Sequence, residues 1–123
     1  MIQRFGSGGP YEDTIGYSRV VRAGHLFVTA GCTSIADDAY EQARGAFGVG
    51  IEALAAAGCP IENVIQTRMY ITERALADEV GRAHKDAFGD VRPAATMVVV
   101  AGLIDPRMLV EVELVGQCGL ARG

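Results

Sequence analysis

Hydrophobic residues recur along the chain either every three or four residues, as in a helix, or at every second residue, as in a strand. The first pattern predicts a helix at residues 39–57. Its apolar positions are Ala43, Phe47, Ile51 and Leu54. Asp38 precedes the first turn and Glu41 follows three residues later, which is the spacing of a capping box. Gly58, with Pro60 just beyond it, predicts the end of the helix. Glycines inside this helix cost about 1 kcal/mol each relative to Ala, but they let it lie close to a sheet.

A second helix is predicted between Thr72, which can cap its first turn, and Gly89, near which it ends. One face of this helix carries Leu76, Val80, Ala83 and Ala87. His84 stands on the flank of that apolar face. We therefore expect the His84 side chain to lie at the surface.

Apolar and polar residues alternate in the remaining segments, the pattern of strands with one buried face. The predicted strands span 17–22, 25–30, 63–72, 94–101 and 108–115, with a further strand at 2–5. Ala23-Gly24 joins the first two long strands as a hairpin, since glycine supplies the positive φ of a tight turn. Pro93 marks the entry to the strand at 94–101, and Asp105-Pro106-Arg107 turns the chain into the last strand.

This order of elements predicts an α+β domain of two layers, with a mixed sheet of five to six strands and both helices on one face. Residues 1–123 then form a single domain. The side chains predicted to face the helices are Ile65, Thr67, Met69, Ile71, Met108, Val110, Val112 and Leu114. Those predicted on the second face are Gln66, Arg68, Tyr70, Leu109, Glu111, Glu113 and Val115. Because that second face is half apolar, we expect it to be buried against another copy of the chain.

Composition and charge argue against several classes of partner and site. The formal net charge is −4, and ten of the eleven basic residues are Arg, scattered without clustering, which argues against nucleic acid as a partner. No segment has the length and apolarity of a signal peptide or a membrane span, so no membrane partner is expected. Three cysteines and two distant histidines predict neither a disulfide framework nor a metal site, and they favour a cytoplasmic location.

Five segments in this order resemble the RidA/YjgF family of small proteins over almost the whole chain. They are "IGYSRVVRAGHLFVTAG", "QARGAFGVGIEALAAAG", "VIQTRMYIT", "RPAATMVVV" and "LVEVELVG". The resemblance implies a chorismate-mutase-like fold, a homotrimer with a cleft at each subunit interface, and no cofactor. It also implies a hydrolase or deaminase activity on reactive enamines and imines, such as 2-aminoacrylate, which yields ketoacids and ammonia.

The resemblance also marks candidate site residues. Tyr17 stands where the family has the Tyr of "GPYSQA", and Gly31 where it has the Gly of "SGQ". Glu111 matches the first Glu of "EIE", which is implicated in positioning the hydrolytic water. Cys32 follows Gly31 where Gln is common, and Met97 stands where many members have Cys. The resemblance therefore predicts a catalytic Glu111 and a set of substrate-binding residues: Tyr17, Gly31, Cys32, Ala95 and Met97.

One departure from the family pattern concerns the substrate. The family motif reads Pro-Ala-Arg, whereas this chain reads Pro93-Ala94-Ala95, and Ala95 cannot replace a guanidinium that clamps a carboxylate. The predicted pocket thus keeps its acid and lacks its anion clamp at Ala95, although Arg92 is a candidate substitute at the rim.

Three functions follow as hypotheses. The leading one is hydrolysis of an imine or enamine that is larger, more apolar or uncharged where the lost Arg would bind. The rival is a non-catalytic module that holds a small ligand or partner in the same cleft, which the missing clamp favours. A ribonuclease or translation-inhibitor role is disfavoured by the net charge of −4. Glu113 is expected to pair with Arg68 across the sheet, and Cys32 to be a small buried residue rather than a nucleophile.

Overall fold

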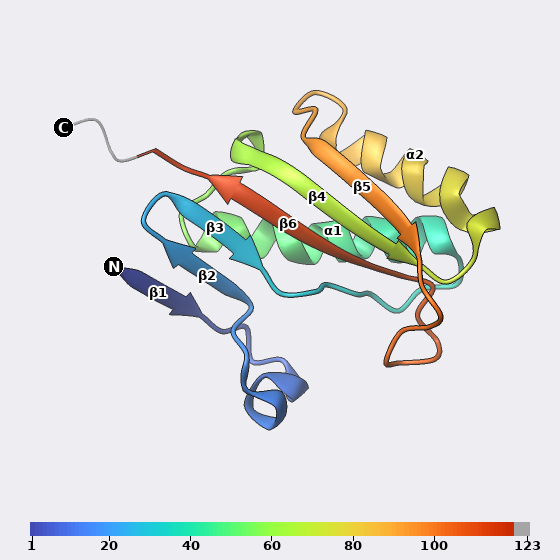
Figure 1. Cartoon of the computed structure of the whole chain (residues 1–123), viewed down its shortest axis with the longest axis horizontal. Coiled ribbons are helices and arrows are strands. Elements are labelled where there is room, and N and C mark those ends of the chain that lie inside the picture. Colours follow the sequence, from blue (N-terminus) through green and yellow to red (C-terminus); the bar gives the residue numbers. More distant parts are fainter. Residues whose placement is uncertain (120–123) are drawn as a thin grey trace.

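A mixed sheet in the order β1-β2-β3-β6-β4-β5 forms one layer, and both helices cover the same face of it (Figure 1). The computed structural model describes residues 1–119. The strands are β1 (Ile2–Phe5), β2 (Val20–Ala23), β3 (Leu26–Thr29), β4 (Val64–Ile71), β5 (Ala94–Val99) and β6 (Val110–Gln117). Only β4 and β5 run parallel, and the other neighbours are antiparallel. The predicted two-layer α+β class is confirmed.

The long helices are α1 (Ala39–Ala56) and α2 (Ala77–Phe88), and the short helical segments are η1 (Glu12–Gly16), η2 (Ile61–Asn63) and η3 (Arg74–Leu76). The predicted cap of α1 is confirmed, because the Asp38 carboxylate accepts the Glu41 backbone N–H at 2.8 Å. At the other end Gly58 has a φ of 104°, and the Cys59 N–H donates to the Leu54 carbonyl at 2.8 Å, which ends the helix. Within residues 1–119, no helix is both long and apolar enough to span a bilayer.

Close packing of α1 on the sheet depends on a glycine. A Cβ at Gly50 would lie 2.8 Å from a methyl carbon of Leu114, a fully buried residue of β6. The helix can therefore approach the centre of the sheet only with no side chain at this position. Phe47 and Leu54 lie on the same buried side of α1, and they join the core with Val110, Val112 and Phe88.

Two local predictions were wrong. Ile65 is 46% exposed rather than turned toward the helices, because a register shift between Val64 and Gln66 displaces the start of β4. Thr72 does not cap α2. That helix is preceded by η3 and begins without a side-chain cap, while the Thr72 N–H donates to the Leu109 carbonyl at 3.1 Å.

His84 is not the surface residue that its flank position predicted. Its ring lies edge-on to Phe47 and tilted against Phe88, and Nε2 is 2.8 Å from the hydroxyl of the fully buried Thr67. Burial lowers the pKa of His84. The histidine therefore serves as a half-buried partner for a core hydroxyl on the helix-covered face.

Candidate functional site

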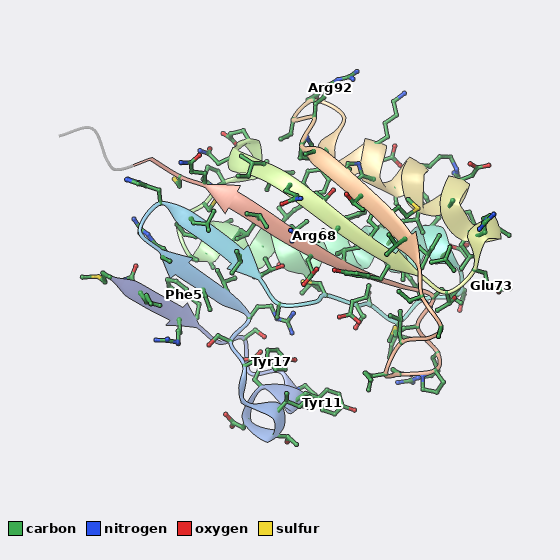
Figure 2. The ribbon with its side chains drawn as sticks, in the orientation of Figure 1. Phe5, Tyr11, Tyr17, Arg68, Glu73 and Arg92 are labelled. Atoms are coloured by element: carbon green, nitrogen blue, oxygen red, sulfur yellow. The ribbon has the colours of Figure 1, made fainter. Side chains whose placement is uncertain are left out.

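A cavity of about 480 Å³ lies between the segment that precedes β2 and the loop that joins β5 to β6. Its polar lining includes Tyr17, Arg19, Thr33, Asp105 and Glu111, beside Gly31. Its apolar lining includes Tyr11, Ile15, Leu103, Ile104 and Met108. Figure 2 shows Tyr11 and Tyr17 on the segment before β2, with the β5–β6 loop on the other side of the space they border. Two other hollows, of about 600 Å³ and 610 Å³, are not lined by Glu111.

Glu111 lies in the cavity because the residues on either side of it in β6 point toward the helices, which leaves Glu111 on the opposite face of the strand. Val110 and Val112 are fully buried under the helices, so the intervening Glu111 projects from the open face of the sheet. A pair of backbone hydrogen bonds between Cys32 and Val112, at 2.8 and 3.0 Å, holds Gly31 beside this side chain. A Cβ at Gly31 would collide with the Glu111 carboxylate, so only glycine leaves room for the acid in this place.

The environment of Glu111 favours its protonated form more than water would. Burial raises the pKa of the Glu111 carboxyl, the charge of Glu113 raises it further, and the charge of Arg19 opposes both. A carboxyl whose pKa is raised is a better general base when ionised than an ordinary surface glutamate. The raised pKa thus gives Glu111 the character expected of a catalytic acid or base.

Arg19 is the site residue that sequence reasoning missed. Its Nη1 donates to the Gly31 carbonyl at 2.7 Å and to the Cys32 sulfur at 3.5 Å, and its Nη2 reaches the Tyr17 hydroxyl at 3.5 Å. The guanidinium also lies 5.7 Å from the centre of the Tyr17 ring. In the sequence it is one of ten dispersed Arg residues, and the available signal was that it stands two positions after Tyr17, where the motif "GPYSQA" has Gln.

Glu113 occupies the same face of β6 but has a different partner from the one predicted. Arg68 is opposite Glu113 in register, yet the Tyr70 hydroxyl donates to the Glu113 carboxylate and Arg68 donates to the Gln66 side chain at 3.3 Å. Figure 2 shows Arg68 on the open face of β4. The hydrogen bond to Glu113 raises the pKa of Tyr70. Glu113 is therefore held by a tyrosine outside the cavity lining.

The structure brings together three of the candidate site residues and leaves three apart. Tyr17, Gly31 and Glu111 line one cavity. Cys32 is 1% exposed, and burial raises the pKa of its thiol, so it is a core residue rather than a thiolate nucleophile. Ala95 and Met97 lie on β5, the edge strand on the other side of β4, and neither lines the cavity within one chain.

Arg92 does not line the cavity either. It is exposed in the turn before β5, and Figure 2 shows it at the opposite end of the molecule from Tyr17. The turn gives Arg92 a φ of 56°. Within one chain, Arg92 therefore cannot serve as the substitute clamp for the cavity. Among residues 1–119, no three His, Cys, Asp or Glu side chains gather as metal ligands.

Comparison with known proteins places the chain among close relatives. The family model described as Endoribonuclease L-PSP matches residues 9–118. The Mycobacterium tuberculosis protein Rv2704, a member of the YjgF/YER057c/UK114 family, is 41% identical with a TM-score of 0.93, over 96% of this chain and all of that one. Protein SCO2049 of Streptomyces coelicolor is 43% identical over 92% of this chain and 90% of its own length. The Pseudomonas aeruginosa protein PA3499 is 28% identical with a TM-score of 0.86, over 100% of this chain and 98% of that one.

Proposed function

This chain belongs to the Endoribonuclease L-PSP family, also called YjgF, and we propose that it hydrolyses a reactive imine or enamine in the cavity that contains Glu111. The observation that carries the proposal is the position of the Glu111 carboxyl. It is half-buried, its pKa is raised by burial, and it lies against Gly31 in a cavity large enough for a small molecule.

The reaction requires one water and one group that moves a proton. Ionised Glu111 accepts a proton from water as the oxygen attacks the carbon of the C=N bond, and the protonated carboxyl then passes that proton to the nitrogen, which restores the carboxylate. The resulting carbinolamine then breaks its C–N bond, ammonia leaves, and a C=O bond forms. An enamine enters the same path after protonation on carbon converts it to the imine.

We further propose that the working form is a homotrimer with the cleft completed by a neighbouring copy. The open face of the sheet combines polar side chains such as Tyr70 and Glu113 with the apolar Val98, which is 42% exposed. Ala95 and Met97 lie on the edge strand opposite the buried Thr67 and Met69, on the helix side of the sheet and away from the cavity of their own chain, so a neighbouring copy would have to meet them at the β5 edge. A neighbouring copy is the arrangement that would let β5 residues contribute to a site with Glu111.

The substrate is proposed to differ from small 2-imino acids. Ala95 stands where the family resemblance places an Arg, so this position offers no bidentate contact to a carboxylate. Ala95→Arg should improve turnover of 2-aminoacrylate by roughly ten- to a hundredfold, provided that β5 reaches the cavity of a neighbouring copy. Rapid turnover of 2-aminoacrylate by the unaltered chain would contradict the proposed change of substrate.

The central test measures imine hydrolysis directly. An amino-acid oxidase generates imines of varied size, and their disappearance is followed with and without the purified chain. We expect acceleration by the natural chain and a large loss in Glu111→Gln. Acceleration of no imine, or equal rates for both proteins, would contradict the proposal. Tight binding of a small carbonyl compound without turnover would favour a non-catalytic binding module instead.

Cleavage of RNA is a second candidate because of the name of the matching family, Endoribonuclease L-PSP. Electrostatics disfavour it, since the net charge is −4 and the basic residues are scattered. Retention of RNA at physiological salt, lost in Arg68→Gln, would reverse this judgement. Absence of RNA binding and cleavage at that salt concentration is the expected result.

A further inference from the structure

The guanidinium of Arg19 is only partly bonded within the fold. Nη1 has two partners, the Gly31 carbonyl and the Cys32 sulfur, whereas Nη2 meets only the Tyr17 hydroxyl at the long distance of 3.5 Å. Nε is buried and has no hydrogen-bond partner in residues 1–119. A buried donor without a partner costs free energy, so this group has bonding capacity that the described chain does not use.

The charge of Arg19 is also without a direct counterion in the described part of the chain. The ion pairs found in residues 1–119 join Arg44 to Glu41 and Arg107 to Asp105. Glu111 lines the same cavity and interacts with Arg19 at longer range, as the opposing effects on its pKa indicate. A half-buried guanidinium that lacks an ion-pair partner is suited to an anion, and Nη2, whose partner is at 3.5 Å, is the part of it that a ligand in the cavity can reach, because Nε is buried.

The rest of the cavity lining sets the character of the remaining part of the ligand. Tyr11, Ile15 and Ile104 line it, and each is more than half exposed, with Ile104 at 94%. Apolar side chains left in water at the mouth of a cavity gain free energy when an apolar group covers them. The cavity of about 480 Å³ has room for such a group beside the Arg19 guanidinium.

We propose that Arg19 is a specificity-determining residue, which binds the anionic group of a small ligand whose apolar body lies against Tyr11, Ile15 and Ile104. This inference deepens the proposed function and rests on it for the choice of cavity. It places the anion contact on the segment before β2 rather than on β5, where Ala95 offers none. The substrate class is then an imine with a carboxylate or a similar anion at one end and a ring or branched chain at the other.

Binding of matched probes tests the proposal without any turnover. Titration calorimetry compares 3-phenylpropanoate with 3-phenylpropanamide, which differ in charge and share the apolar body. We expect the natural chain to bind the acid more tightly by about ten- to a hundredfold. Propanoate, which lacks the ring, should bind at least about tenfold more weakly than 3-phenylpropanoate. Equal affinity for the acid and the amide, or no binding of the acid up to millimolar concentration, would overturn the proposal.

Variants separate an anion contact from a structural brace on Gly31. Arg19→Gln should abolish the preference for the acid, while Arg44→Gln, an exposed position on α1, should leave it unchanged. Arg19→Lys keeps the positive charge but loses the planar guanidinium, so its preference for the acid over the amide should be several-fold smaller. This variant provides the test if Arg19→Gln fails to fold. A preference for the acid that is undiminished in either Arg19 variant would overturn the inference.

The outcomes also distinguish this inference from the proposed reaction. If no imine is hydrolysed but the preference for the acid depends on Arg19, the proposed reaction fails and the anion site stands. If imines are hydrolysed through Glu111 but the preference survives the loss of Arg19, the reaction stands and the role of Arg19 is refuted.

Discussion

Each face of the sheet has a titratable side chain whose neutral form is favoured by burial, His84 on one face and Glu111 on the other. The two side chains differ in whether a ligand can reach them. On the helix-covered face, burial lowers the pKa of His84, whose ring packs against Phe47 and bonds to Thr67. On the open face, burial raises the pKa of Glu111, which lines a cavity. Burial therefore shifts both pKa values. In the closed core it accompanies a structural hydrogen bond between His84 and Thr67, whereas in the cavity, which a ligand can enter, it produces a candidate catalytic acid.

The strongest test of this difference is the loss of the Glu111 charge. Glu111→Gln keeps the shape of the side chain but removes the base, so kcat/KM for imine hydrolysis should fall by about 10²- to 10⁴-fold. Glu113→Gln is the matched control on the same face, and its rate should stay within a few-fold of the natural chain. A comparable loss in both variants would show that the cavity does not distinguish these carboxylates.

Displacement of Glu111 should have the next largest effect. In Gly31→Ala the new Cβ would meet the Glu111 carboxylate, which must move. We expect kcat/KM to fall by about 10²-fold, because a shift of about 1 Å can have this effect on a positioned group. The carboxylate is the far end of a flexible side chain and can move aside, so the free energy of unfolding should fall by less than about 1 kcal/mol.

Gly48→Ala supplies the control for that substitution. Gly48 lies on α1, and a Cβ there would meet nothing within 4 Å. This variant should be more stable by about 0.5 to 1 kcal/mol, with unchanged turnover. Chemical denaturation and imine assays measure both effects, and unchanged turnover in Gly31→Ala would show that the position of the acid is unimportant.

On the covered face, a substitution should alter stability and leave turnover intact. Thr67→Val preserves the side-chain shape but removes the hydroxyl that bonds to His84, so the free energy of unfolding should fall by about 1 to 3 kcal/mol. Thr14→Val, at an exposed position of η1, should change it by less than about 0.5 kcal/mol. A large loss of imine turnover in Thr67→Val at full folding would break the contrast between the two faces.

The fold was predicted mainly from the spacing of apolar residues, because residues on the buried side of a helix recur every three or four positions and those of a strand at every second position. This spacing placed α1 correctly, together with the cap at Asp38. It could not show the register shift at Ile65, since Val64 and Ile65 are both apolar and residue type alone does not say which of them faces the core. It also could not show that α2 packs His84 over Thr67, because that contact depends on how helix and sheet meet.

The candidate site was predictable only in part for the same reason. The resemblance to a known family marked Tyr17, Gly31 and Glu111, which line one cavity. Arg19 was missed because its role arises from tertiary pairing, in which Cys32 bonds to Val112 and so brings Gly31 between Arg19 and Glu111. The departure from the motif "GPYSQA" at Arg19 marks the position as unusual but does not show which groups it contacts.

The smallest expected effect is a shift in the pH profile, and it compares the two carboxylates most directly. The ionised form of Glu111 is the proposed base, so kcat/KM should decline as the pH falls through its raised pKa. The charge of Glu113 contributes to raising that pKa, so Glu113→Gln should move the acidic limb of the profile to lower pH. Tyr70→Phe removes the hydroxyl bonded to Glu113 while keeping the Glu113 charge, so it should leave the limb near its original position. A limb that moves to higher pH in Glu113→Gln would mean that the group titrating in the profile is not Glu111, because loss of a neighbouring negative charge can only favour ionisation of a carboxyl.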